Sequence, residues 1–72
     1  MRDLAKQGDP AKIAPYLGDA DLSVRLEATK ALVDMGGPKT VDPLVTATRD
    51  NDSEIQIRAT DGLVNVYLPG YT

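Results

Sequence analysis

DADLSVRLEATKALV, at residues 19–33, recurs without a gap as DNDSEIQIRATDGLV at residues 50–64. The first copy starts at Asp19 and the second at Asp50, and this offset (50 minus 19 is 31) holds throughout. A repeat of this length is typical of arrays in which one supersecondary unit packs against the next. The sequence therefore predicts two copies of one structural unit. Six aligned positions are identical: Asp19/Asp50, Asp21/Asp52, Ala28/Ala59, Thr29/Thr60, Leu32/Leu63 and Val33/Val64.

Apolar residues recur in both copies at the spacing of a helix. Asp21 and Asp52 precede these helices and are suited to cap their first N–H groups, and Gly36-Gly37 is suited to end the first one. At about 100° per residue, one face of each helix collects five apolar or small positions, which we expect to form the core. They are Val24, Ala28, Ala31, Leu32 and Met35 in the first copy, and Ile55, Ala59, Gly62, Leu63 and Val66 in the second.

A shorter helix is expected before each of these. It should begin at Pro10 in the first unit and at Pro38 in the second, because the first N–H groups of a helix have no partner and proline lacks one. The offset between these starts (38 minus 10 is 28) is smaller than the offset between the capped helices, so the first unit is predicted to be about one turn shorter. Pro43 either bends the second of these helices or lies close to its true start.

The alignment divides the chain into repeats whose two ends are incomplete. Because both ends fall inside a repeat, we expect a fragment of a longer helical array. Two repeats leave apolar faces uncovered, and about three are needed for stability, so we expect marginal stability or self-association through the uncapped ends. The predicted parts are the end of a preceding helix at 1–8, repeat 1 at 9–36, repeat 2 at 37–67 and the start of a truncated repeat at 68–72.

Composition excludes several classes of function. The 72 residues contain no His and no Cys, which removes the usual general base, the thiol nucleophile and the soft metal ligands. We therefore expect no enzyme, no cofactor and no metal. A net charge of -3 disfavours nucleic acid, and no apolar run approaches the length of a membrane span. Residues 50–54, Asp-Asn-Asp-Ser-Glu, favour helix capping over calcium binding, because Ile55 stands where a calcium loop needs Gly.

The pattern Asp-x-Asp-x-x-Val-Arg-x-x-Ala-x-x-Ala-Leu-x-x-Met-Gly at residues 19–36 resembles the HEAT repeats of the phycobilisome-lyase type. The resemblance implies an all-α fold, an α–α superhelix of about two helical hairpins plus a partial N-terminal helix. It also implies first helices on a convex side, second helices on a concave side, and protein binding far more often than catalysis. The second copy departs from the pattern, with Gln56 at the Arg position and Gly62 at an Ala position.

A second stripe on the capped helices is predicted to bind a partner. It lies away from the core face and, with the family's geometry, would point into the concave groove. The alternative is that the stripe only contacts neighbouring helices. Arg25 likewise either grips a partner's carboxylate or ties one repeat to an acidic turn of Asp19, Asp21, Asp50 or Asp52. The predicted partner-binding residues are Leu22, Arg25, Leu26, Thr29, Val33, Ile57, Thr60 and Val64, with Lys30, Ser53 and Arg58 beside them.

These observations favour a scaffold that binds a protein or peptide along its second helices. The alternative is an accessory domain of an enzyme, of the lyase or DNA-repair kind, whose active residues lie outside this segment. A third possibility is a purely structural spacer, which would have no accessible groove. We expect no nucleic-acid and no membrane partner.

Overall fold

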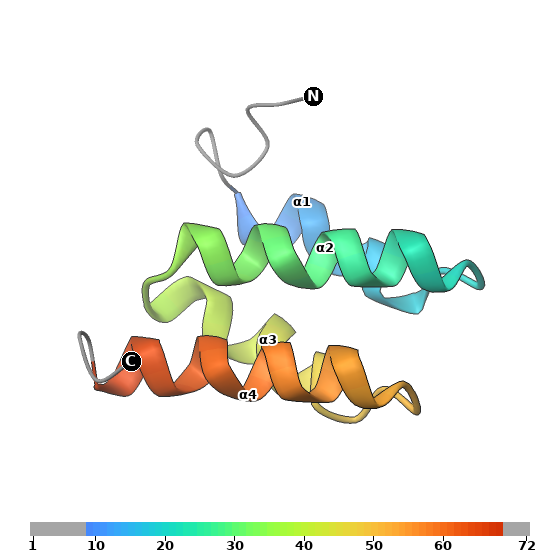
Figure 1. Ribbon diagram of the computed structural model, residues 1–72. Coiled ribbons are helices and arrows are strands. Elements are labelled where there is room, and N and C mark those ends of the chain that lie inside the picture. The colour runs from blue at the N-terminus through green and yellow to red at the C-terminus, as the bar shows by residue number, and fades with distance from the viewer. Residues whose placement is uncertain (1–8, 69–72) are drawn as a thin grey trace.

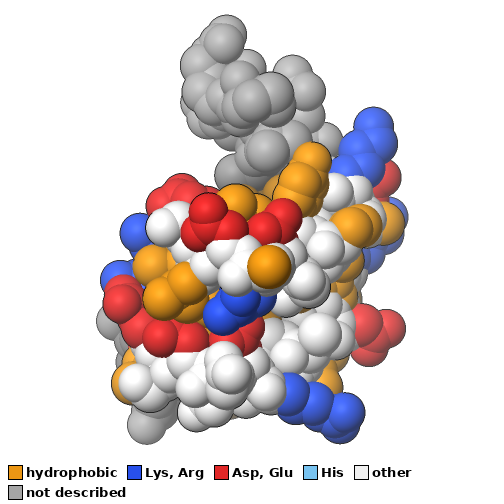
Figure 2. Space-filling model, turned by 90° about the vertical axis from the view of Figure 1, so that its right-hand side faces the viewer, with side chains coloured by type: hydrophobic (Ala, Val, Ile, Leu, Met, Phe, Trp, Pro, Cys, Tyr) orange, Lys and Arg blue, Asp and Glu red, His pale blue; other side chains and the backbone are white. Residues whose placement is uncertain are grey.

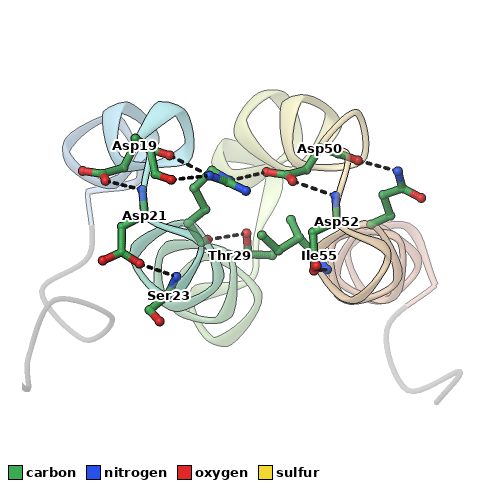
Figure 3. A network of polar contacts seen from close by, with 10 residues as sticks. Asp19, Asp21, Ser23, Thr29, Asp50, Asp52 and Ile55 are labelled. Carbon is green, nitrogen blue, oxygen red and sulfur yellow. Dashed lines mark hydrogen bonds and ion pairs between the residues drawn. The ribbon is translucent and has the colours of Figure 1, made fainter.

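The computed structural model describes residues 9–68, and every regular element within that range is a helix. Figure 1 shows two hairpins side by side, each pairing a short helical segment with a long helix. Seen end-on in Figure 3, the short segments form one layer and the long helices the other. The chain is therefore all-α, as predicted. The elements are α1 (Pro10–Ile13), the 3-10 helix η1 (Ala14–Gly18), α2 (Leu22–Met35), the 3-10 helix η2 (Pro38–Thr40), α3 (Val41–Ala47) and α4 (Ser53–Tyr67).

Both long helices begin at the predicted aspartates. The Asp21 carboxylate accepts the Ser23 N–H at 2.8 Å at the start of α2, and the Asp52 carboxylate accepts the Ile55 N–H at 3.1 Å at the start of α4. Capping of this kind satisfies N–H groups that have no partner inside the helix. At the other end of α2, Gly36 has a φ of 64°, which glycine adopts at little cost. The predicted capping of both helices is confirmed.

The prolines shape the first layer. Pro10 opens α1 as predicted, but the helix becomes a 3-10 helix from Ala14, because Pro15 cannot donate an N–H to the carbonyl four residues earlier. Pro38 opens only the short η2, and α3 starts at Val41. Pro43 lies in the first turn of α3, where its missing N–H is not needed.

The first layer bears on the prediction that the first repeat is about one turn shorter. Its helical segments open at Pro10 and at Pro38, where η2 leads directly into α3, and 38 minus 10 is 28. The long helices start at Leu22 and Ser53, and 53 minus 22 is 31. The two layers therefore keep the two different offsets found in the sequence. α-Helical geometry itself begins at Pro10 in the first repeat but only at Val41 in the second, because Pro38 opens a 3-10 helix.

The core lies between the two layers. Half of the predicted core positions are buried in it, while Val24, Ala31, Met35, Leu63 and Val66 are half-buried. Leu32 and Ile55, one from each long helix, have no exposed surface. At about 25 cal/mol per Å² of apolar surface removed from water, the buried aliphatic side chains supply the main stabilising term. The buried apolar residues are Ile13, Leu17, Ala28, Leu32, Leu44, Ala47, Ile55 and Ala59.

Gly62 sets the spacing of the two hairpins. It is buried in α4, and a Cβ added there would lie 2.8 Å from Cγ2 of Val33 and 3.0 Å from Cδ1 of Leu44. Even a methyl group therefore has no room unless a neighbouring side chain moves. The absence of a side chain at this position allows α4 to approach α2 closely.

Parts of the predicted repeat organisation lie beyond the described range. The predicted end of a preceding helix at residues 1–8 is outside it, as is the predicted truncated repeat at 68–72 apart from Leu68.

Candidate interaction surface

Arg25 joins the two repeats at their capped ends. Its Nε donates to Oδ2 of Asp50 at 2.8 Å, and its Nη1 donates to the carbonyl oxygens of Asp19 at 2.9 Å and Ala20 at 3.2 Å (Figure 3). The side chains of Arg25 and Asp50 are 18% and 9% exposed, so water screens this ion pair only in part. Arg25 therefore ties its own turn to the turn of the next repeat, as the structural alternative predicted. Because Nε and Nη1 are used within the chain, the structural role of Arg25 is the one that the contacts support.

Asp50 organises the second turn around this contact. Its Oδ1 accepts the N–H of Asp52 at 2.9 Å while its Oδ2 accepts Arg25, and its carbonyl oxygen accepts Nε2 of Gln56. Gln56 thus reproduces the bond that Arg25 makes to the carbonyl of Asp19, at the equivalent positions of the second repeat. Figure 2 looks onto this end of the molecule, where acidic side chains gather around basic ones.

On α2 the predicted partner-binding stripe is covered. We call Leu26, Thr29 and Val33 the α2 stripe. Thr29 has no exposed surface, and its hydroxyl donates to the carbonyl of Arg25 at 2.9 Å. Val33 faces Gly62 of α4, and Leu26 and Val33 both pack against the core while keeping some exposure. Thr29, one of the predicted partner-binding residues, is therefore inaccessible in this structure, because α4 lies against its side of α2 (Figure 3).

On α4 the equivalent stripe is open. We call Ile57, Thr60 and Val64, the counterparts of the α2 stripe in the second repeat, the α4 stripe. Ile57 is 61% exposed, Thr60 is exposed and Val64 is half-buried. The hydroxyl of Thr60 donates to the carbonyl of Gln56 at 2.8 Å, which is the bond that Thr29 makes in α2. The two stripes therefore have the same local structure and differ in whether a helix covers them. Leu22, at the start of α2, is also exposed, at 44%.

Charged side chains line a shallow hollow between α2 and α4. Nζ of Lys30 lies 3.7 Å from Oε2 of Glu27, and Nη2 of Arg58 lies 2.9 Å from Oε2 of Glu54, so each cation has an anion within its own helix. Charged side chains therefore predominate in this hollow. The hollow is lined by Lys30, Val33, Asp34, Arg58 and Asp61.

A second hollow, which the sequence reasoning missed, lies where the first layer meets the end of α4. Its apolar wall includes Val66 and the exposed Tyr67 of α4, and the start of α1, the 3-10 helix η2 and the start of α3 form the rest. Only the spatial approach of segments far apart in the chain brings these residues together, so periodicity within one helix gives no signal for it.

The calcium alternative is disfavoured by the roles of the carboxylates that suggested it. Asp52 caps α4, and Asp50 is bonded to Arg25 and to the backbone of its own turn. Among residues 9–68 there is no cluster of three or more carboxylates arranged to hold a metal ion. Within the same range no helix has both the length and the apolar character needed to cross a membrane.

The comparison with known families agrees with this architecture. Residues 2–64 match the family described as HEAT repeats. The chain belongs to the HEAT repeat family. The match spans both helical hairpins and most of the sequence. Separate comparisons with curated proteins and with solved structures returned no match. Members of the HEAT repeat family generally mediate protein–protein interactions.

Proposed function

We propose that this HEAT-repeat segment is a scaffold that binds a protein partner through the α4 stripe. The observation that carries the proposal is the contrast between equivalent positions. Thr29 is fully buried against α4, whereas Thr60 and the aliphatic residues Ile57 and Val64 are accessible. An apolar helix face of this composition gains free energy when another protein removes it from water.

The proposal includes no catalytic role for this segment. Its 72 residues contain no His and no Cys, so a reaction would depend on carboxylates. Asp19, Asp21, Asp50 and Asp52 already accept hydrogen bonds from the turns that they organise. The alternative, an accessory domain of a lyase-type or DNA-repair-type HEAT protein, places the active residues elsewhere. The resemblance of residues 19–36 to HEAT repeats of the phycobilisome-lyase type is the basis on which we propose that subtype for the chain.

Site-specific cross-linking tests the proposed surface. A photoreactive amino acid at residue 57 should capture the partner in an extract of the source cells. The same probe at Val45, which is 38% exposed on α3 in the other layer, is the matched control. We expect a captured protein at residue 57 and none at residue 45.

Binding of the identified partner then provides the quantitative test. Ile57→Glu and Val64→Glu each place a charge in the α4 stripe and should weaken binding at least tenfold, while Val45→Glu should leave it unchanged. Circular dichroism verifies that each variant keeps its helicity. Full binding by folded Ile57→Glu and Val64→Glu chains would remove the α4 stripe as the binding surface.

A further inference from the structure

Each long helix has two flanks, and the repeat allows them to be compared. On one flank lie the stripes already defined. On the other flank lie Ile55 and Gly62 of α4, whose counterparts in the first repeat are Val24 and Ala31 of α2. We call these two pairs the α4 back face and the α2 back face. Ile55 and Gly62 are buried, whereas Val24 and Ala31 are only half-buried.

Within the chain, a stripe of one repeat packs on the back face of the next. Val33 of the α2 stripe lies against Gly62 of the α4 back face. Figure 3 shows Ile55 directed from α4 toward α2, beside Thr29. The ion pair of Arg25 with Asp50 closes one end of this contact. The contact between α2 and α4, which we call the seam, thus shows which kind of surface packs on a helix stripe of this sequence.

We propose that the α4 stripe binds the α2 back face of a second copy of this chain, head to tail. The inference rests on the proposed function, since it assigns an occupant to the same stripe. The α4 stripe repeats the chemistry of the α2 stripe, with Ile57 for Leu26 and identical Thr and Val residues. The α2 back face repeats the aliphatic and small residues of the α4 back face. The second copy therefore offers the face that the first copy already uses internally.

Two differences make this intermolecular seam weaker than the internal one. Gln56 stands in the position of Arg25, so the guanidinium that would reach Asp19 of the second copy is missing. Ala31 stands in the position of Gly62, and its methyl group keeps the helices further apart. We therefore expect a weak, concentration-dependent association.

The contact is heterologous, because the two copies contribute different surfaces. Such contacts build open chains of molecules unless the rotation between copies closes a ring. Sedimentation velocity over a concentration series of the purified chain should show the weight-average sedimentation coefficient rising with concentration. Ile57→Glu should abolish that rise, and Val45→Glu should leave it unchanged.

The missing ion pair offers a gain-of-association variant. Gln56→Arg restores the donor and should tighten self-association about tenfold, the effect of a charge-assisted hydrogen bond of about 1.4 kcal/mol. Asp19→Asn removes the expected acceptor while its side-chain oxygen can still accept the Asp21 N–H, so the double variant should lose the gain. Unchanged association of Gln56→Arg, or a gain that survives Asp19→Asn, would contradict the proposed register.

A chain that stays monomeric at all concentrations overturns the second-copy proposal. Another occupant would then cover the α4 stripe. The proposed function is tested separately: cross-linking of a different protein at residue 57 by a monomeric chain would support partner binding and refute self-stacking. Failure of both experiments would reject both uses of the stripe.

Discussion

Replacing Gly62 by Ala should destabilise the protein, although alanine is the better helix former. The added Cβ would lie 2.8 Å from Cγ2 of Val33 and 3.0 Å from Cδ1 of Leu44. The gain in helix propensity is about 1 kcal/mol, and overpacking a core costs about 1–3 kcal/mol. We expect a net loss of about 1 kcal/mol in the free energy of unfolding, which in a chain of this size lowers the melting temperature by about 4–8 °C.

Thermal unfolding followed by far-ultraviolet circular dichroism measures this loss. Gly18→Ala is the matched control, because a Cβ at Gly18 meets no atom within 4 Å; its melting temperature should not fall. Val33→Ala removes the methyl groups nearest to Gly62, so Gly62→Ala should become neutral or stabilising in that background. A Gly62→Ala chain that is more stable than the parent by the full helix-propensity gain would refute the close approach of α2 and α4.

Three further substitutions test the rest of the structure. Arg25→Gln keeps a donor for the turn but loses the ion pair with Asp50, and should lower the free energy of unfolding in urea by about 2 kcal/mol. Asp50→Asn should lower it much less when Arg25 is already replaced, and additive losses would argue against a direct pair. Asp52→Ala removes the cap of α4 and should cost about 1 kcal/mol, with a corresponding drop in melting temperature; an unchanged melting temperature would show that the cap contributes nothing. Thr29→Glu should prevent folding while Thr60→Glu leaves helicity intact, and equal effects in circular dichroism would contradict the different burial of the two stripes.

The sequence predicted the long helices well because several independent signals coincide there. Aspartate caps, helical periodicity and the glycine stop all point to the same boundaries for α2. The first layer was harder to predict, since its prolines align at one offset and its helix starts at another. Proline restricts the backbone locally, but whether it opens an α-helix, as Pro10 does, or a 3-10 helix, as Pro38 does, depends on the tertiary contacts that follow it.

The interaction surface was only half predictable from the sequence. The angular spacing of residues around one helix places Thr29 away from the core face, but it does not indicate where a neighbouring helix lies. The repeat itself held part of the missing signal, because the long helix of the second unit packs on the stripe of the first. Among the described residues, that contact distinguishes the buried Thr29 from the exposed Thr60.

Asp50 also links the folding of the two repeats. The carboxylate that shapes the turn before α4 binds, through its other oxygen, a guanidinium anchored in the preceding hairpin. The turn before α4 therefore makes this contact only when the first hairpin is folded, which couples the stability of the two units. In a linear array, a contact of this kind contributes to the nearest-neighbour interface term.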